Sequence, residues 1–272
     1  MRPFREEMQI LAESRQTEAE IRARLWIAAD MTLDASGDFL TGVLGFADAE
    51  DFRDLDRQSF SWIKGEVQRA HGASRSTMVP FAVDLRDDHR WVAFATSHRI
   101  RQNNFSQGLG IILTSAVKRL RLIPAEWEVD LVTSFTTVEE WLEEHPDVYE
   151  LVRIVRFPNP RRDIDEDRKK MKALGASRKA ESYSSGRDNR LELEGNPVFE
   201  HLSEGLDTGD VAIILKARGP AGSKPTFKSW ESADEAHIED FGDDYQLGME
   251  RILDVLRRYV EERGKGQGDE TP

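Results

Sequence analysis

Residues 21–46, IRARLWIAADMTLDASGDFLTGVLGF, decide the fold class because they combine a period of two with a turn and a second apolar arm. From residue 21 to residue 33, every second position is apolar, and the positions between them include Arg22, Arg24, Asp30 and Thr32. This pattern is typical of a strand with one buried and one mostly solvated face. The turn residues 34–37 (DASG) then lead into residues 39–46, which return as the second arm of a hairpin.

The rest of the chain mixes strands and helices in irregular order. Further strands are predicted over residues 78–85, 91–96, 127–135, 151–157, 210–217 and 226–230. Helices are predicted over residues 3–14, 59–70, 105–120, 137–145 (begun by a capping box of Thr137 and Glu140), 163–175 and 245–262. Residues 177–196 fit either two thin strands or a mobile loop.

This mixture predicts an α+β fold with a mixed, largely antiparallel sheet. Its parts are hairpins, one strand–helix–strand unit over residues 127–157 and a long C-terminal helix. We expect a single domain over residues 1–262, with a division near residue 160 as the alternative. Residues 263–272 have the composition of a disordered tail.

Composition excludes several classes of protein. The formal net charge is −13, so the bulk field repels nucleic acid and anionic membranes, and any nucleic-acid contact needs a local basic patch. The chain has no cysteine, which excludes disulfides, thiolate metal sites and thiol nucleophiles. Its apolar runs are too short to span a bilayer. We therefore expect a cytoplasmic protein with no membrane association.

Acidic residues are missing from residues 90–125 (RWVAFATSHRIRQNNFSQGLGIILTSAVKRLRLIPA), although the chain contains 51 of them. The basic and titratable side chains of this window are Arg90, His98, Arg99, Arg101, Lys118, Arg119 and Arg121. An acidic protein that keeps one stretch free of carboxylates favours a positive surface for an anionic partner. The window is predicted to form a strand, a loop and a helix.

The predicted ligand-binding residues lie in the loop that enters this helix: His98, Arg99, Arg101, Gln102, Asn103 and Asn104. Arginine binds phosphate bidentately, and a helix N-terminus offers free backbone donors. The amide side chains would position a nucleic acid or a nucleotide, or read its base edges. The alternative is that Asn104 only caps the helix and the arginines pair with distant carboxylates.

Other charged groups fit structural roles better than functional ones. Cations at residues 118–121 are expected at a helix C-terminus from the helix dipole alone. Asp163, Asp165 and Glu166 would hold Mg²⁺ in a metal-dependent nuclease, but adjacent helical positions point in different directions. The six histidines show no metal-binding spacing, and no cofactor-binding motif is present. We therefore predict no metal and no cofactor, and leave open whether the protein is an enzyme.

A protein partner is the second hypothesis for function. The acidic segments 48–56 and 231–244 would engage a basic partner. The C-terminal helix carries an apolar seam that suits either a partner helix or the protein's own core. The seam covers only two heptads, which is too few to require a partner, so packing in the protein's own core is favoured. The seam residues are Tyr245, Met249, Ile252, Leu256 and Tyr259.

Residues 152–160 (VRIVRFPNP), followed by a charged helix and residues 175–177 (GAS), carry a family resemblance. This segment resembles an uncharacterised bacterial family associated with mobile-element and phage-defence loci. The resemblance implies a prokaryotic cytoplasmic protein that acts with the product of a neighbouring gene. It transfers no catalytic residue.

Overall fold

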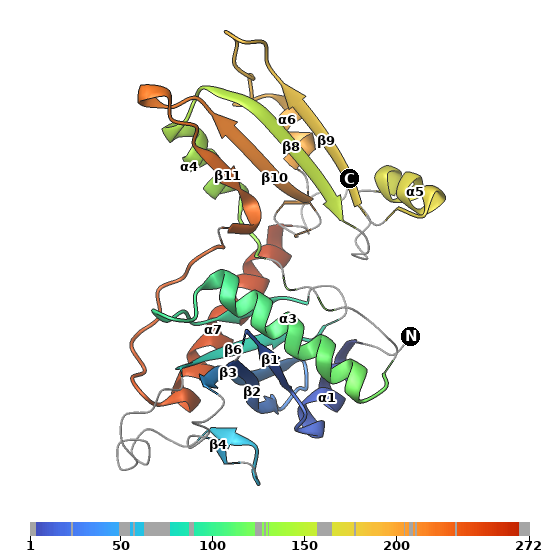
Figure 1. The fold of residues 1–272 in the computed structure, drawn as a ribbon, viewed down its shortest axis with the longest axis vertical. Coiled ribbons are helices and arrows are strands. Elements are labelled where there is room, and N and C mark those ends of the chain that lie inside the picture. Colours follow the sequence, from blue (N-terminus) through green and yellow to red (C-terminus); the bar gives the residue numbers. More distant parts are fainter. Residues whose placement is uncertain are drawn as a thin grey trace. The chain divides into compact units, whose positions relative to one another are not determined.

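The computed structural model describes residues 4–266 apart from 23, 49–54, 57, 63–76, 87–89, 123–126, 128, 130, 157–164, 177, 204, 207–208, 210 and 232. The chain forms two compact units, Met1–Val129 with Ala236–Pro272, and Asp130–Glu235. Each unit is built on an antiparallel sheet with helices (Figure 1), so the predicted α+β class is confirmed. The division lies near residues 129 and 235, whereas the sequence favours one domain or a division near residue 160.

The first unit is built on a sheet with the strand order β1-β2-β3-β6-β7. Its strands are β1 (Glu18–Ile21), β2 (Arg24–Leu33), β3 (Phe39–Asp48), β6 (Thr77–Asp84) and β7 (Val92–Phe94). The remaining elements are a short ribbon of β4 (Leu55–Asp56) and β5 (Ser61–Trp62) and the helices α1 (Phe4–Ser14), α3 (Gln102–Arg119) and α7 (Tyr245–Gly266). Both predicted hairpins are confirmed, because β2 pairs with β3 and β6 with β7.

Helices cover both faces of this sheet. Trp26 packs against α3 at Gly108, and Ile27 shares a core cluster with Met249 of α7. Because successive strand residues point to opposite faces, α3 and α7 lie on opposite sides of β2 (Figure 1). The prediction of one solvated face is therefore wrong for the centre of β2, where Trp26 and Ala28 are buried beneath α3.

The second unit has the strand order β11-β10-β8-β9, with every pair antiparallel. Its strands are β8 (Val148–Arg156), β9 (Arg178–Ser184), β10 (Val211–Ala217) and β11 (Thr226–Lys228). Its helices are α4 (Phe135–Glu144), α5 (Asp165–Leu174), α6 (Pro197–Ser203) and the single turns η3 (Pro220–Gly222) and η4 (Ser229–Glu231).

The helices of the second unit cover one face of its sheet. Val138 of α4, Met171 of α5 and Phe199 of α6 belong to one core cluster with Leu151 of β8 and Ile213 of β10. Along β10, buried residues alternate with half-buried ones. The alternation agrees with a two-layer arrangement in which no helix in the described part of this unit covers the other face of the sheet.

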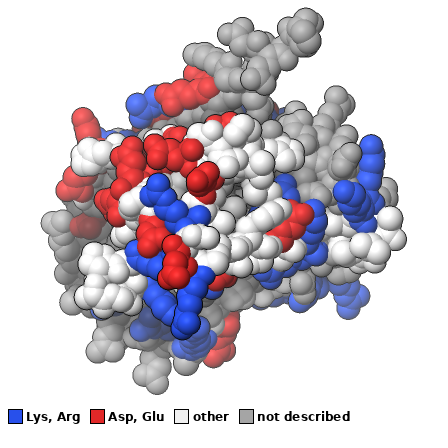
Figure 2. All heavy atoms as spheres, turned by 90° about the horizontal axis from the view of Figure 1, so that it is seen from above, with Lys and Arg blue, Asp and Glu red and all other residues white. Residues whose placement is uncertain are grey.

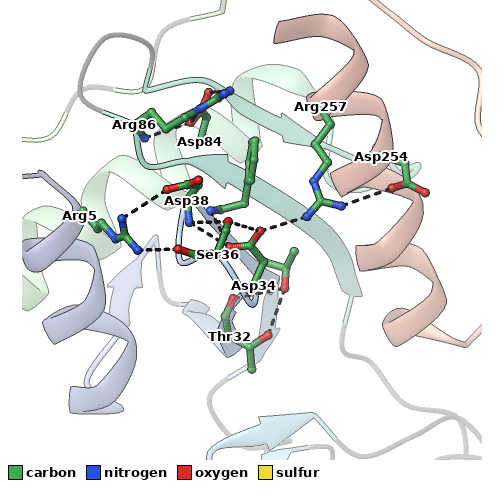
Figure 3. A network of polar contacts seen from close by, with 11 residues as sticks. Arg5, Thr32, Asp34, Ser36, Asp38, Asp84, Arg86, Asp254 and Arg257 are labelled. Carbon is green, nitrogen blue, oxygen red and sulfur yellow. Dashed lines mark hydrogen bonds and ion pairs between the residues drawn. The ribbon is translucent and has the colours of Figure 1, made fainter. Parts of the chain in front are cut away.

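Carboxylates around the β2–β3 turn of the first unit each meet an arginine (Figure 3). The fully buried Asp84 accepts hydrogen bonds from Nε and Nη2 of Arg86, at 2.9 and 2.7 Å. The other two pairs are Arg5–Asp38 at 3.3 Å and Arg257–Asp34 at 3.0 Å. The last of these ties the turn to α7.

Some predicted elements are absent or begin elsewhere. Residues 61–62 form β5, where a helix over 59–70 is predicted, and residues 63–70 lie outside the described part. The described residues of the predicted strand 127–135 form no strand. Leu131 and Thr133 are buried there, so the apolar pattern reflects a buried connection rather than pairing in a sheet.

Two predicted helix ends also differ. Helix α4 starts earlier than its predicted capping box, because the side chain of Ser134 accepts the N-cap hydrogen bond from the backbone N–H of Thr137. Helix α7 continues to Gly266, into the stretch predicted as a disordered tail. Residues 267–272 lie outside the described residues.

Candidate functional site

The predicted binding loop joins β7 to α3 in the first unit and is held at both ends. The rings of Phe94 and Phe105 stack with their centroids 3.8 Å apart, across the two ends of the loop. Between them, the side chain of Ile100 is fully buried. Its backbone N–H donates to Ser97 Oγ at 3.0 Å, and its carbonyl accepts from Ser97 N at 2.9 Å. These contacts order the loop without any ligand.

Arg99 and Arg101 flank the buried Ile100 and are both exposed. Neither arginine side chain forms a hydrogen bond or an ion pair with any residue that the structure describes. The alternative in which these arginines pair with distant carboxylates therefore finds no support among the described residues. Two cations on one ordered loop are left exposed to solvent.

The backbone at the start of α3 adds donors to this loop. Arg101 is the N-cap residue, its side chain makes no capping hydrogen bond, and the first turn contains no acidic residue. Asn104 does not cap the helix, which corrects the structural interpretation of this residue. Its Nδ2 instead donates to the carbonyl of Arg99 at 3.1 Å and so braces the loop.

The other predicted residues differ in how available they are. His98 and Asn103 are exposed, and their side chains have no partner among the described residues. Gln102 is half-buried and already has a contact within the protein. The loop therefore presents His98, Arg99, Arg101 and Asn103, while Asn104 braces it. Sequence reasoning missed the anchors Phe94 and Ile100, since nothing in their spacing separates them from ordinary core residues.

Arg119, at the other end of α3, has a structural role. Its Nη1 and Nη2 donate to the carbonyls of Gln16 and Glu18, each at 3.0 Å, at the edge of β1. Helix α3 has 18 residues, so Arg119 lies about 25 Å along the axis from the binding loop. The expectation that residues 118–121 do not join the loop site agrees with this separation.

The remaining candidates for chemistry find little support. No group of three or more His, Asp or Glu side chains in the described part of the chain could hold a metal ion. Asp163 and the side chains of Asp165 and Glu166 lie outside that part. A cavity of about 10 Å³ beside Thr133 and Ser229 in the second unit has room for about one water molecule.

Of the surfaces proposed for a protein partner, the apolar seam of α7 is used within the chain. Met249, Ile252 and Leu256 of the α7 seam are buried, and Met249 packs in the core of the first unit. The prediction that this seam serves the protein's own core is confirmed. In the segment 231–244, Glu239 forms an ion pair with Arg251. Most of the segment 48–56 lies outside the described residues.

Charges of both signs lie next to one another on the face shown in Figure 2. Ion pairs within the second unit include Lys216–Glu150 at 2.9 Å and Arg218–Asp147 at 3.0 Å. Arg99 and Arg101, which have no ion-pair partner in the described part of the chain, differ from these neutralised pairs.

Comparison of the chain with protein-family models, with curated proteins and with solved structures found no match. The family resemblance of residues 152–177 thus stays a prediction. No helix within the described residues is both long enough and apolar enough to cross a bilayer.

Proposed function

We propose that the protein recognises an anionic ligand, a nucleic acid or a nucleotide, through the loop of residues 98–104. The observation that carries the proposal is the exposure of Arg99 and Arg101 without a partner among the described residues. The chain has 13 more acidic than basic residues, so two guanidinium groups on an ordered loop that meet no described carboxylate are a specific feature.

Phosphate is the anion that this geometry fits best. A guanidinium group donates two parallel hydrogen bonds to phosphate oxygens, and the two arginines lie on either side of one buried anchor. The uncapped first turn of α3 adds backbone N–H donors and the positive end of the helix dipole. Because the loop is ordered beforehand, little conformational entropy is lost on binding.

A nucleic-acid backbone suits this site better than a free nucleotide. Pockets for small ligands bury most of the ligand surface, whereas these side chains stand on an exposed loop. A polymer presents successive phosphates to an exposed surface and gains affinity by releasing counterions. The exposed amide of Asn103 would then contact a base edge or a sugar.

The biological setting of the proposal rests on the family resemblance alone. It places the protein in a prokaryotic anti-phage defence system, as an accessory or recognition protein with a protein partner. A metal-dependent nuclease remains the less favoured alternative, since no metal-holding group supports it in the described part of the chain.

The test is a binding titration with two probes, a fluorescent single-stranded oligonucleotide and ATP, at about 50 mM salt. We expect the wild-type protein to bind the oligonucleotide. The double variant Arg99→Ala/Arg101→Ala should bind it with an affinity at least about tenfold lower. The slope of log affinity against log salt should also fall by about 1.4, because two phosphate contacts to a single strand are lost.

The matched control is Lys118→Ala/Arg121→Ala. This variant removes the same charge from two exposed residues near the other end of α3, far from the loop. Its affinity for the oligonucleotide should therefore stay within about twofold of the wild-type value. Equal losses in the two double variants would show that net charge, and not the loop, governs binding. Unchanged binding by Arg99→Ala/Arg101→Ala, or no binding of either probe, would refute the proposal.

A further inference from the structure

Strand β9 is an open edge of the sheet in the second unit (Figure 1). It pairs on one side with β8, and no strand of the described residues lies on its other side. Arg178, Ala180, Ser182, Tyr183 and Ser184 are all exposed. A strand edge of this kind presents backbone N–H and C=O groups that another strand can bind.

The ladder identifies which backbone groups point outward. Ser185 N donates to the carbonyl of Tyr149 at 2.9 Å, so residue 185 faces β8. Since the backbone direction alternates along a strand, Lys179, Glu181 and Tyr183 also face β8. The outward N–H and C=O groups are therefore those of Arg178, Ala180, Ser182 and Ser184, and they have no partner among the described residues.

The edge of the other sheet shows how this chain blocks a strand edge. The carbonyls of Gln16 and Glu18, at β1, are occupied by the guanidinium group of Arg119. No described side chain caps β9 in the same way. Charged residues commonly protect edge strands, but here the carboxylate of Glu181 is already held by ion pairs with Lys179 at 2.7 Å and with the buried Arg153 at 3.2 Å.

We propose that β9 pairs with β9 of a second copy of the chain, antiparallel across a two-fold axis at Ala180. This register makes hydrogen-bonded pairs of Ala180 with Ala180 and of Arg178 with Ser182 in the two copies. It also sets Lys179 of each copy opposite Glu181 of the other. The two sheets would become one continuous antiparallel sheet.

Charge selects this register among those that the outward groups allow. An axis at Glu181 would place two carboxylates opposite each other, which is destabilising in a cross-strand pair. An axis at Ser182 would place Glu181 opposite Tyr183 and form no new ion pair. Only the axis at Ala180 places opposite charges across the junction twice.

Exposed apolar side chains on the same unit support the proposal. Leu174 of α5 is 82% exposed, Val198 of α6 is 63% exposed and Tyr183 of β9 is 40% exposed. Helices α5 and α6 both lie on the covered face of the sheet, and Figure 1 shows α6 behind β8 and β9. A two-fold axis perpendicular to the sheet brings the helical layers of two copies to the same side, where these apolar groups gain neighbours.

The test is sedimentation velocity from about 1 to 100 µM protein. The mass should rise from 31.1 kDa towards about twice that value. Ser182→Pro removes one outward N–H and should keep the protein monomeric, since proline is tolerated at an edge position whose N–H faces solvent. Ser182→Ala is the matched control, because it keeps the N–H and should still dimerise.

A second variant keeps the proposal testable if Ser182→Pro does not fold. Lys179→Glu leaves every backbone donor in place but sets like charges opposite each other, so it should also be monomeric. A wild-type protein that stays monomeric throughout would overturn the proposal. A dimer that survives Ser182→Pro would exclude β9, and one that survives Lys179→Glu would exclude the register at Ala180.

Discussion

Replacing Asp34 by alanine should cost more stability than any other single change at the β2–β3 turn (Figure 3). Its Oδ1 accepts hydrogen bonds from the backbone N–H groups of Asp38 and Phe39, at 3.0 and 3.1 Å. Its Oδ2 accepts from Ser36 Oγ at 2.8 Å and from Arg257 Nη2 at 3.0 Å. One carboxylate thus closes the turn and joins it to α7.

The size of the effect follows from which partners are exposed. Arg257 has a side-chain exposure of 42%, so its ion pair contributes about 0–1 kcal/mol. Phe39 is 7% exposed, and a backbone N–H left without its charged acceptor there costs about 1–3 kcal/mol. We expect Asp34→Ala to lower the free energy of unfolding by about 2–4 kcal/mol. Asp34→Asn keeps the oxygen that accepts the two backbone bonds and should cost about 1–2 kcal/mol.

The assay is urea unfolding, combined with hydrogen exchange at the amides of Asp38 and Phe39. Exchange reports on the turn itself, even if the two units unfold separately. Asp254→Ala is the control, because this carboxylate lies 3.9 Å from Arg257 and is 71% exposed. It should change stability by less than about 0.5 kcal/mol. Equal effects of Asp34→Ala and Asp254→Ala, or unchanged exchange in Asp34→Ala, would refute the reasoning.

The pH dependence of the free energy of unfolding tests the same contacts of Asp34, because the direction of its change can be predicted. Burial acts to raise the pKa of Asp34, but the hydrogen bonds from Phe39, Ser36, Arg257 and Asp38 together lower it. A lowered folded pKa adds stability above the unfolded pKa of about 3.9, and this stability is lost as the pH falls through the folded value. The difference in the free energy of unfolding between wild type and Asp34→Asn should therefore be largest at pH 7 and shrink below about pH 4.

Two further changes test other contacts of the fold. Arg218 donates to the carbonyls of Gly186, Arg187 and Asn189, so Arg218→Ala should raise amide exchange in residues 185–190 by about tenfold or more. Unchanged exchange would show that the loop does not depend on Arg218. A Cβ added at Gly108 would lie 2.6 Å from the Trp26 ring. Gly108→Ala should therefore lower the free energy of unfolding, measured in urea, by about 1–3 kcal/mol. An unchanged free energy would mean that α3 can shift to make room.

The sequence predicted those elements whose patterns are local. The hairpin over residues 21–46 follows from alternation and turn residues, and the apolar stripe of α3 follows from helical spacing. Even there, alternation did not show the break at Arg22 or the bulge at Asp30, where φ is 52° and 53°. A period of two predicts on which face of the sheet a side chain lies. It does not predict where the backbone leaves the extended conformation at a single residue.

The errors came from burial that is not local. Trp26 and Ala28 were assigned to a solvated face because the pattern of β2 does not show that α3 returns to cover them. Residues 127–135 were predicted as a strand because a buried connection and a strand share the same apolar composition. The division into two units depends on residues 236–266 rejoining the first unit, and such a long-range contact has no signal in any local window.

The candidate site was predicted in outline but not in geometry. The acid-free window located the loop, and the exposure of its arginines agrees with that prediction. The roles of Asn104 and Ile100 depend on the path of the backbone, which determines whether a side chain caps, braces or anchors. Residue types alone do not distinguish these roles, because asparagine is favoured at caps and in loops alike.

The arginines of this chain differ in whether the structure shows a partner for them, and this difference supports the binding proposal. Arg119 and Arg218 hold backbone carbonyls, and Arg86 and Arg257 hold carboxylates, so each has a polar partner within the protein. Exposed ion pairs add only about 0–1 kcal/mol, so leaving a surface arginine unpaired costs the fold little. Arg99 and Arg101, without a partner among the residues that the structure describes, can therefore bind a ligand with little loss of stability. The same reasoning applies to β9, whose solvated backbone groups add nothing to the monomer and become stabilising only when another strand binds them.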